Sequence, residues 1–169
     1  MKKFFVAALM AVMSLGVNAQ EGIRVWYGAG IANLSYDGAK SEFKVLNVGV
    51  DYTAAINDQF NWTAGAGYIT KGAKEWDPGY LQVEANGSWN FVKEDAFKVG
   101  LFTGPYVGFM LAKDDAEEEK SVDFGWQAGV QGYYRNISLK VGYEYGFLDT
   151  FDGGDSKPSQ VFFRVGYTF

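Results

Sequence analysis

The chain has 169 residues, with 15 basic and 20 acidic side chains, no histidine and no cysteine. The net charge of −5 makes nucleic acid an unfavourable partner. Without histidine or cysteine, a Ser-His-Asp triad, a cysteine nucleophile and a disulfide framework are all excluded, so we expect neither an enzyme nor a cofactor. Aromatics at 18%, 22 glycines and only 3 prolines are typical of many short strands joined by tight turns.

Residues 1–19 have the features of an export signal. Lys2 and Lys3 precede an apolar run over residues 4–17, and Val17-Asn18-Ala19 places small or apolar residues at the cleavage positions. The run is too short for a good transmembrane helix. We therefore predict a signal peptide over residues 1–19 and one domain over residues 20–169.

In the first half of the remaining chain, four segments carry apolar side chains on alternate positions: residues 22–34, 44–52, 60–70 and 81–91. The fourth segment is the clearest, because Leu81, Val83, Ala85, Trp89 and Phe91 alternate with Gln82, Glu84, Asn86, Ser88 and Asn90. A strand separates such sets onto two faces, whereas a helix would mix them. The pattern predicts four strands.

The second half repeats the pattern at residues 97–111, 122–134, 137–147 and 161–169. Pro105 removes a ladder donor from the first of these segments, so we expect a bulge or bend there. The last segment places Val161, Phe163, Val165, Tyr167 and Phe169 on alternate positions. An unpaired terminal strand would promote aggregation, so we expect a neighbour to close against it in a barrel. This ending also resembles the C-terminal assembly signal of bacterial outer-membrane barrels, which implies the barrel-insertion machinery as a partner.

The connections alternate between compact and long. They are compact at residues 53–59, 92–96 and 135–136, and longer and more polar at residues 35–43, 71–79, 112–121 and 148–159. Short turns at one end and longer loops at the other are typical of outer-membrane barrels, with the turns in the periplasm and the loops outside the cell.

Two observations indicate that the apolar face points outward. The other face is rich in glycine and short amides, which suits the narrow interior of an eight-stranded barrel. Aromatic residues gather at both ends of the apolar face, as expected at the two membrane interfaces. The sequence thus predicts an all-β fold, an eight-stranded antiparallel up-and-down transmembrane β-barrel. A soluble periplasmic ligand-binding barrel, with the faces reversed, is the alternative.

Several short motifs support this prediction through a family resemblance. They are Tyr68-Ile69-Thr70-Lys71-Gly72-Ala73-Lys74, Gly104-Pro105-Tyr106-Val107-Gly108, Asp123-Phe124-Gly125 through Gly129, Tyr143-Glu144-Tyr145-Gly146 and Gly166-Tyr167-Thr168-Phe169. In order and spacing they resemble the PorT-like outer-membrane β-barrel domain family. The resemblance implies a small eight-stranded barrel, similar in shape to outer membrane proteins A and X, and a location in the cell outer membrane. Most members of that family have no assigned activity.

Charged side chains of both signs fall on the predicted inward face. They are Arg24, Lys98, Lys140 and Arg164, with Asp51, Glu84, Asp123 and Glu144. Unpaired buried charges are costly, so we expect these groups to pair and to fill the lumen as a plug. A gated proton or ion path is the alternative. Glu84 and Glu144 could in principle act as an acid and base pair, but charge balance explains them without catalysis.

The predicted loops carry acidic residues, namely Asp114, Asp115, Glu117, Glu118, Glu119, Asp149, Asp152 and Asp155. Their oxygens could hold Ca²⁺ or Mg²⁺, but the spacing fits no EF-hand, so we expect solvated loops and no metal site. We expect a monomer surrounded by outer-membrane lipid and lipopolysaccharide, whose extracellular loops serve adhesion or envelope integrity. A small pore or a transport or secretion accessory is the alternative role.

Overall fold

The computed structural model describes residues 21–34, 41–71, 78–94, 97–112, 121–149 and 157–169. The predicted signal peptide lies outside these residues, and so do most of the acidic loop positions. Within the described ranges, no helix is long and apolar enough to cross a membrane.

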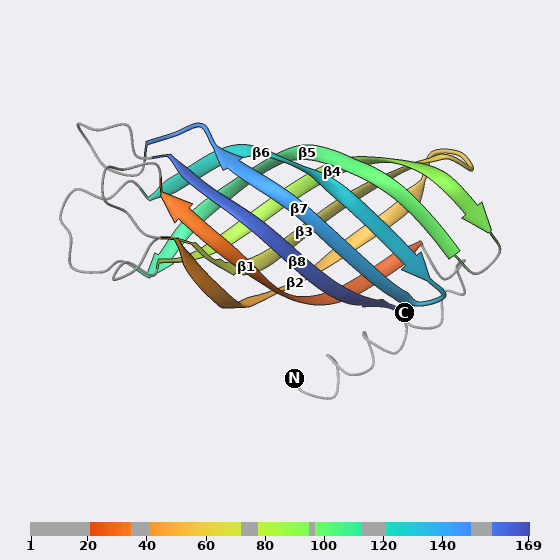
Figure 1. The fold of residues 1–169 in the computed structure, drawn as a ribbon, viewed down its shortest axis with the longest axis horizontal. Coiled ribbons are helices and arrows are strands. Elements are labelled where there is room, and N and C mark those ends of the chain that lie inside the picture. Colours follow the sequence, from red (N-terminus) through yellow and green to blue (C-terminus); the bar gives the residue numbers. More distant parts are fainter. Residues whose placement is uncertain (1–20, 35–40, 72–77, 95–96, 113–120, 150–156) are drawn as a thin grey trace, which may run out of the picture.

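Eight strands form one closed antiparallel barrel, in which each strand pairs with the next in sequence and the last pairs with the first (Figure 1). The strands are β1 (Gly22–Leu34), β2 (Glu42–Ala55), β3 (Phe60–Thr70), β4 (Gly79–Glu94), β5 (Phe97–Ala112), β6 (Val122–Tyr134), β7 (Ile137–Gly146) and β8 (Pro158–Thr168). The predicted fold class is confirmed.

The barrel closes between β1 and β8. Their register runs without a shift from Arg24 opposite Thr168 to Leu34 opposite Pro158. Beyond the last register pair, the Phe169 amide donates to the Ile23 carbonyl at 3.0 Å. The terminal strand therefore has a hydrogen-bonded neighbour on both sides, as its sequence predicted.

The two ends of the barrel differ in their connections. Compact connections join β2 to β3, β4 to β5 and β6 to β7 at one end, which we call the turn end (Figure 1). The C-terminus lies at this same end. The β6–β7 turn is only two residues long and contains Arg135 at a left-handed φ of 52°. The longer connections lie at the opposite end, which we call the loop end.

The pleat of each strand separates an apolar outer face from a polar lumen. In β7, Ser138, Lys140 and Glu144 are buried, whereas Leu139 and Val141 are 48% and 49% exposed. Large aromatic side chains also fill the lumen: Trp26, Tyr80, Phe102, Tyr106, Tyr133 and Phe162. A glycine admits them at Gly142, where a Cβ would lie 2.6 Å from the Phe162 ring and 2.7 Å from the Phe102 ring.

Among the described residues, β4 and β5 show no register shift at Pro105, so the expected bulge is absent there. The β4–β5 register is the same on both sides of it, although the ladder has no pair at Ala85 and Asn86, next to the proline. The register shifts of this strand pair lie instead between Gly79 and Tyr80 and between Asn90 and Val92. Intact ladder pairs on either side hold the strands in register, so one missing N–H donor does not displace them.

Candidate functional site

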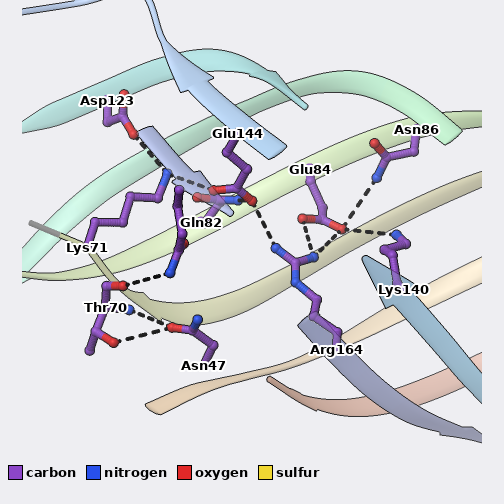
Figure 2. Close-up of polar contacts among 11 residues, drawn as sticks. Asn47, Thr70, Lys71, Gln82, Glu84, Asn86, Asp123, Lys140, Glu144 and Arg164 are labelled. Carbon is purple, nitrogen blue, oxygen red and sulfur yellow. Dashed lines mark hydrogen bonds and ion pairs between the residues drawn. The ribbon is translucent and has the colours of Figure 1, made fainter. Parts of the chain in front are cut away.

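Arg164 of β8 forms the centre of a buried charge network in the lumen (Figure 2). Its Nη1 atom donates to the two carboxylate oxygens of Glu84 at 2.9 and 2.8 Å, and its Nη2 atom donates to Glu144 Oε1 at 3.0 Å. Glu84 belongs to β4 and Glu144 to β7, so one guanidinium links two neighbouring strands with a strand from across the barrel. The same group lies 4.3 Å from the ring centres of Trp26 and Phe162.

Lys71, immediately after β3, extends the network towards the loop end. Its Nζ atom lies 2.9 Å from Asp123 Oδ2 and 3.1 Å from Glu144 Oε2. It also lies 3.9 Å from the ring centre of Tyr106, within the range of a cation–π contact. The sequence pattern places Lys71 in the predicted loop over residues 71–79, outside the predicted lumen set. The sequence did contain a clue to this role. Asp123 is near the loop end of its predicted strand, and none of the predicted lumen cations lies at that end, so Asp123 lacked a predicted partner.

Arg24 and Asp51 form a second ion pair near the turn end. Asp51 Oδ2 accepts from Arg24 Nη2 at 2.7 Å and from Arg24 Nε at 3.2 Å. Tyr133 accepts a further hydrogen bond from Arg24 Nη1 at 3.3 Å. Lys140 lies between this ion pair and the network around Arg164. Its Nζ atom is 3.8 Å from Glu84 and 4.5 Å from the centre of the Phe102 ring.

Lys98 lies apart from this network. It is half-buried near the turn end of β5 and forms no ion pair with any residue that the structure describes. Lys44, which is not among the predicted lumen residues, is also buried, with 4% exposure. The structure thus brings together the other predicted lumen residues, with Lys71 as an additional cation: Arg24, Asp51, Glu84, Asp123, Lys140, Glu144 and Arg164.

The ion pairs follow one another along the lumen with alternating sign, in the order Lys140, Glu84, Arg164, Glu144, Lys71 and Asp123. Amide side chains add hydrogen bonds from Gln82 to Glu144 at 3.0 Å and from Asn86 to Glu84 at 3.3 Å. Such a network offsets the desolvation of each charge with a nearby opposite charge. A cavity beside Arg24 and Lys140 measures only about 10 Å³, about the size that holds one water molecule.

Two buried amides in the turn-end halves of β4 and β6 have no hydrogen-bond partner among the described residues. Both polar atoms of Asn90 and Gln131 are in this position. Buried amides usually bond to protein or to ordered water.

Glu84 and Glu144 are the lumen carboxylates that could in principle act as an acid and base pair. Glu84 and Glu144 share Arg164, an arrangement that balances charge. Within the described ranges, no group of three carboxylate, histidine or cysteine side chains could hold a metal ion. Of the acidic loop residues, Asp149 is described, and the others lie outside the described residues.

The residues of the predicted assembly signal all lie on the outer face of β8 or directly after it. Their side chains are 38% to 50% exposed: Val161, Phe163, Val165, Tyr167 and Phe169. Tyr167 and Phe169 form an edge-on ring pair with centres 5.2 Å apart. The five residues of the predicted signal therefore form a continuous apolar strip that ends at the turn end.

Comparison with protein-family models gives no match, and comparison with curated proteins gives none either. Solved structures match over almost their whole length. The outer membrane enzyme PagL matches with a TM-score of 0.58 and 13% identity, over 86% of this chain and 99% of that one. Neisserial surface protein A matches with a TM-score of 0.54 and 19% identity, over 87% and 97%. The chain has the fold of small outer-membrane β-barrels.

The attachment invasion locus protein Ail of Yersinia pestis matches equally well, with a TM-score of 0.54 and 19% identity, over 88% of this chain and 99% of that one. These neighbours agree with the architecture that the family resemblance implied, but they do not establish the PorT-like family itself. They include an enzyme as well as an attachment protein, so the shared fold does not determine an activity.

Proposed function

We propose that this chain is an integral outer-membrane protein whose filled barrel presents its loops for adhesion or envelope integrity. The observation that carries the proposal is the inversion of its polarity. Buried positions hold Arg164, Glu84 and Glu144, whereas the outer surface carries large apolar side chains such as Phe163 and Val141, which are 45% and 49% exposed. An apolar surface that surrounds the barrel would promote aggregation in water, and a bilayer removes that liability.

The aromatic residues of the outer face support the same location. Towards the turn end, Tyr52 and Trp62 form a ring pair with centres 5.8 Å apart. Towards the loop end, Phe124 and Phe147 form another with centres 5.8 Å apart. Aromatic girdles of this kind are characteristic of the two interfaces of transmembrane barrels.

Membrane fractionation tests the location. We expect the mature protein in the outer-membrane fraction, resistant to alkaline wash and released only by detergent. Release into the soluble periplasmic fraction would instead support a soluble ligand-binding barrel. N-terminal sequencing of the same material tests the predicted signal peptide, because cleavage should leave Gln20 as the first residue.

Planar-bilayer recording tests the filled lumen. We expect no sustained conductance from the purified barrel, because the ion pair between Arg164 of β8 and Glu84 of β4 crosses the lumen. Steady conductance would favour the alternative role, a small pore or a transport accessory. Channels that appear only after Arg164→Ala would agree with a plug that this residue holds together.

Further proposals concern the partners, oligomeric state, family and activity of the chain in this location. We propose contact with lipopolysaccharide around the loop half, recognition of the terminal strand by the barrel-insertion machinery, a monomeric state, membership of the PorT-like family and no enzymatic activity. The attachment role named for Ail makes adhesion a reasonable first assay. Cells that display the wild-type barrel should bind host surfaces more strongly than cells that display a barrel with residues 113–120 replaced by a Gly-Ser linker.

A further inference from the structure

The small cavity in the lumen is shared by the two groups of charges. Its lining includes both members of the ion pair between Arg24 and Asp51, and it includes Lys140 and Arg164 from the larger network. The other residues that line it are Trp26, Ser138 and Gly166. All seven belong to the consecutive strands β7, β8, β1 and β2, so the cavity lies behind the seam that closes the barrel. Its volume of about 10 Å³ suits one molecule of the size of water.

The cavity exists where long side chains cross two small residues. Gly166 is opposite Trp26 in the β1–β8 register and opposite Ser138 in the β7–β8 register. Arg24 lies over the glycine, because a Cβ there would be 2.7 Å from Arg24 Cδ. Gaps of this size are few in a packed interior, and those with an apolar lining stay dry. The polarity of the lining therefore decides what this cavity holds.

Three polar atoms of the lining residues are buried and form no hydrogen bond with any residue that the structure describes. They are Trp26 Nε1, Arg164 Nε and Asp51 Oδ1. The three residues are only 4%, 4% and 2% exposed, so bulk water does not reach them. A buried polar atom without a partner is costly, and such atoms usually bond to protein or to ordered water.

The chemistry of these atoms selects the occupant. The Trp26 indole N–H and the Arg164 Nε–H can only donate, whereas Asp51 Oδ1 can only accept. One water molecule satisfies all three, because it accepts two hydrogen bonds and donates one, and three is the usual number for a buried water. A chloride ion would be repelled by the Asp51 carboxylate, and a metal cation would be repelled by the arginines.

We propose that this cavity binds one ordered water molecule, which accepts hydrogen bonds from Trp26 Nε1 and Arg164 Nε and donates one to Asp51 Oδ1. Among the described residues, no ion pair connects Asp51 to the Arg164 network, and the water supplies that connection. Polar contacts then run without interruption from Arg24 near the turn end to Asp123 near the loop end. The water is part of the filled lumen, and the inference holds whatever the loops bind.

Nuclear magnetic resonance of the isotopically labelled mature barrel in detergent micelles tests the site. The chain has five tryptophans, and Trp26→Phe identifies the indole signal of Trp26 by its disappearance. We expect water cross-peaks at this indole proton with opposite signs in the NOE and ROE spectra, the signature of a water molecule held beside it. Cross-peaks of equal sign would show proton exchange with the solvent and would overturn the site.

Three serine variants separate a bound water from other sources of the signal. Ser138→Val adds a methyl-sized group to the lining and should reduce the cross-peak at least tenfold. Ser138→Ala removes the hydroxyl without filling the cavity, so it should leave the cross-peak within about twofold of wild type and exclude relay through that hydroxyl. Ser88→Val is the matched control, because Ser88 is also a lumen serine with 4% exposure but does not line this cavity. It too should leave the cross-peak unchanged.

An unchanged cross-peak in a folded Ser138→Val barrel, or an equal loss in Ser138→Ala or Ser88→Val, would overturn the proposal. A crystal structure of the wild-type barrel provides a measurement that does not depend on the folding of any variant. We expect electron density for one water molecule within hydrogen-bond distance of the three atoms, and a dry cavity would overturn the site. An anomalous peak in this cavity after a bromide soak would identify an anion there and would also overturn it.

Discussion

Replacing Arg164 by methionine tests the lumen network most directly. Among the described residues, Arg164 is the one that forms ion pairs with both Glu84 and Glu144. Methionine is long and apolar, so Arg164→Met keeps much of the packing against Trp26 and Phe162 while it removes the charge. We expect a loss of about 3–5 kcal/mol in the free energy of unfolding, the usual cost of removing one partner from a buried ion pair.

The contacts explain why we expect Arg164→Met to cost as much unfolding free energy as one broken ion pair and not two. The substitution removes hydrogen bonds of 2.8, 2.9 and 3.0 Å to carboxylates that stay buried. Each carboxylate keeps another cation, because Lys140 lies 3.8 Å from Glu84 and Lys71 lies 3.1 Å from Glu144. These remaining partners limit the loss without removing it.

The assay is reversible urea unfolding of the barrel in lipid vesicles, followed by tryptophan fluorescence and by the shift of the folded band on unheated gels. Adding Glu84→Gln to Arg164→Met restores charge balance and should recover at least about 1 kcal/mol as coupling energy. Lys98→Met, outside the network, should change stability by no more than about 0.5 kcal/mol. A cost below about 1 kcal/mol for Arg164→Met, or strict additivity in the double variant, would refute the reasoning.

Two further predictions concern glycine positions and the terminal residue. Gly104→Ala should cost about 1–3 kcal/mol in the same urea assay, because its Cβ would overlap the Ala85 carbonyl oxygen, whereas Gly87→Ala should be neutral or stabilise by about 0.5–1 kcal/mol. Equal effects would contradict the difference in free space beside these two glycines. Deleting Phe169 removes its 3.0 Å hydrogen bond to Ile23 and its ring contact with Tyr167. It should cost the refolded barrel about 1–2 kcal/mol but strongly reduce assembled protein in cells, and normal outer-membrane levels on quantitative immunoblots would contradict this expectation.

The strands were predictable because the pleat alone sets their pattern. Residues 22–34, 60–70 and 122–134 were predicted as strands and coincide with β1, β3 and β6. β2 and β4 extend past the predicted ranges, to Glu42–Ala55 and Gly79–Glu94. Backbone hydrogen bonds do not depend on side-chain alternation, so pairing continues into residues where the pattern has faded.

The lumen was less predictable, because beyond the ends of a strand side chains no longer alternate strictly between the outer face and the lumen. Lys71 lies past the end of β3, yet it reaches back to Asp123 and Glu144. Lys98 lies at a lumen-facing position of β5, as predicted, but this position is near the barrel mouth, where a long side chain can direct its charge to water. The lumen aromatics Phe102 and Phe162 need glycines such as Gly142 across from them. Alternation along one strand does not say which residues meet across a barrel.

The seam between β1 and β8 has a consequence for the order of assembly. Every other strand pair joins neighbours in the sequence, so each can form as a local hairpin. The seam joins Arg24 to Thr168, from opposite ends of the folded chain, and must overcome the closure entropy of everything between them. We therefore expect the hairpins to form early and the seam to close last, so the time for which the open sheet exposes its edges is set by a single slow step.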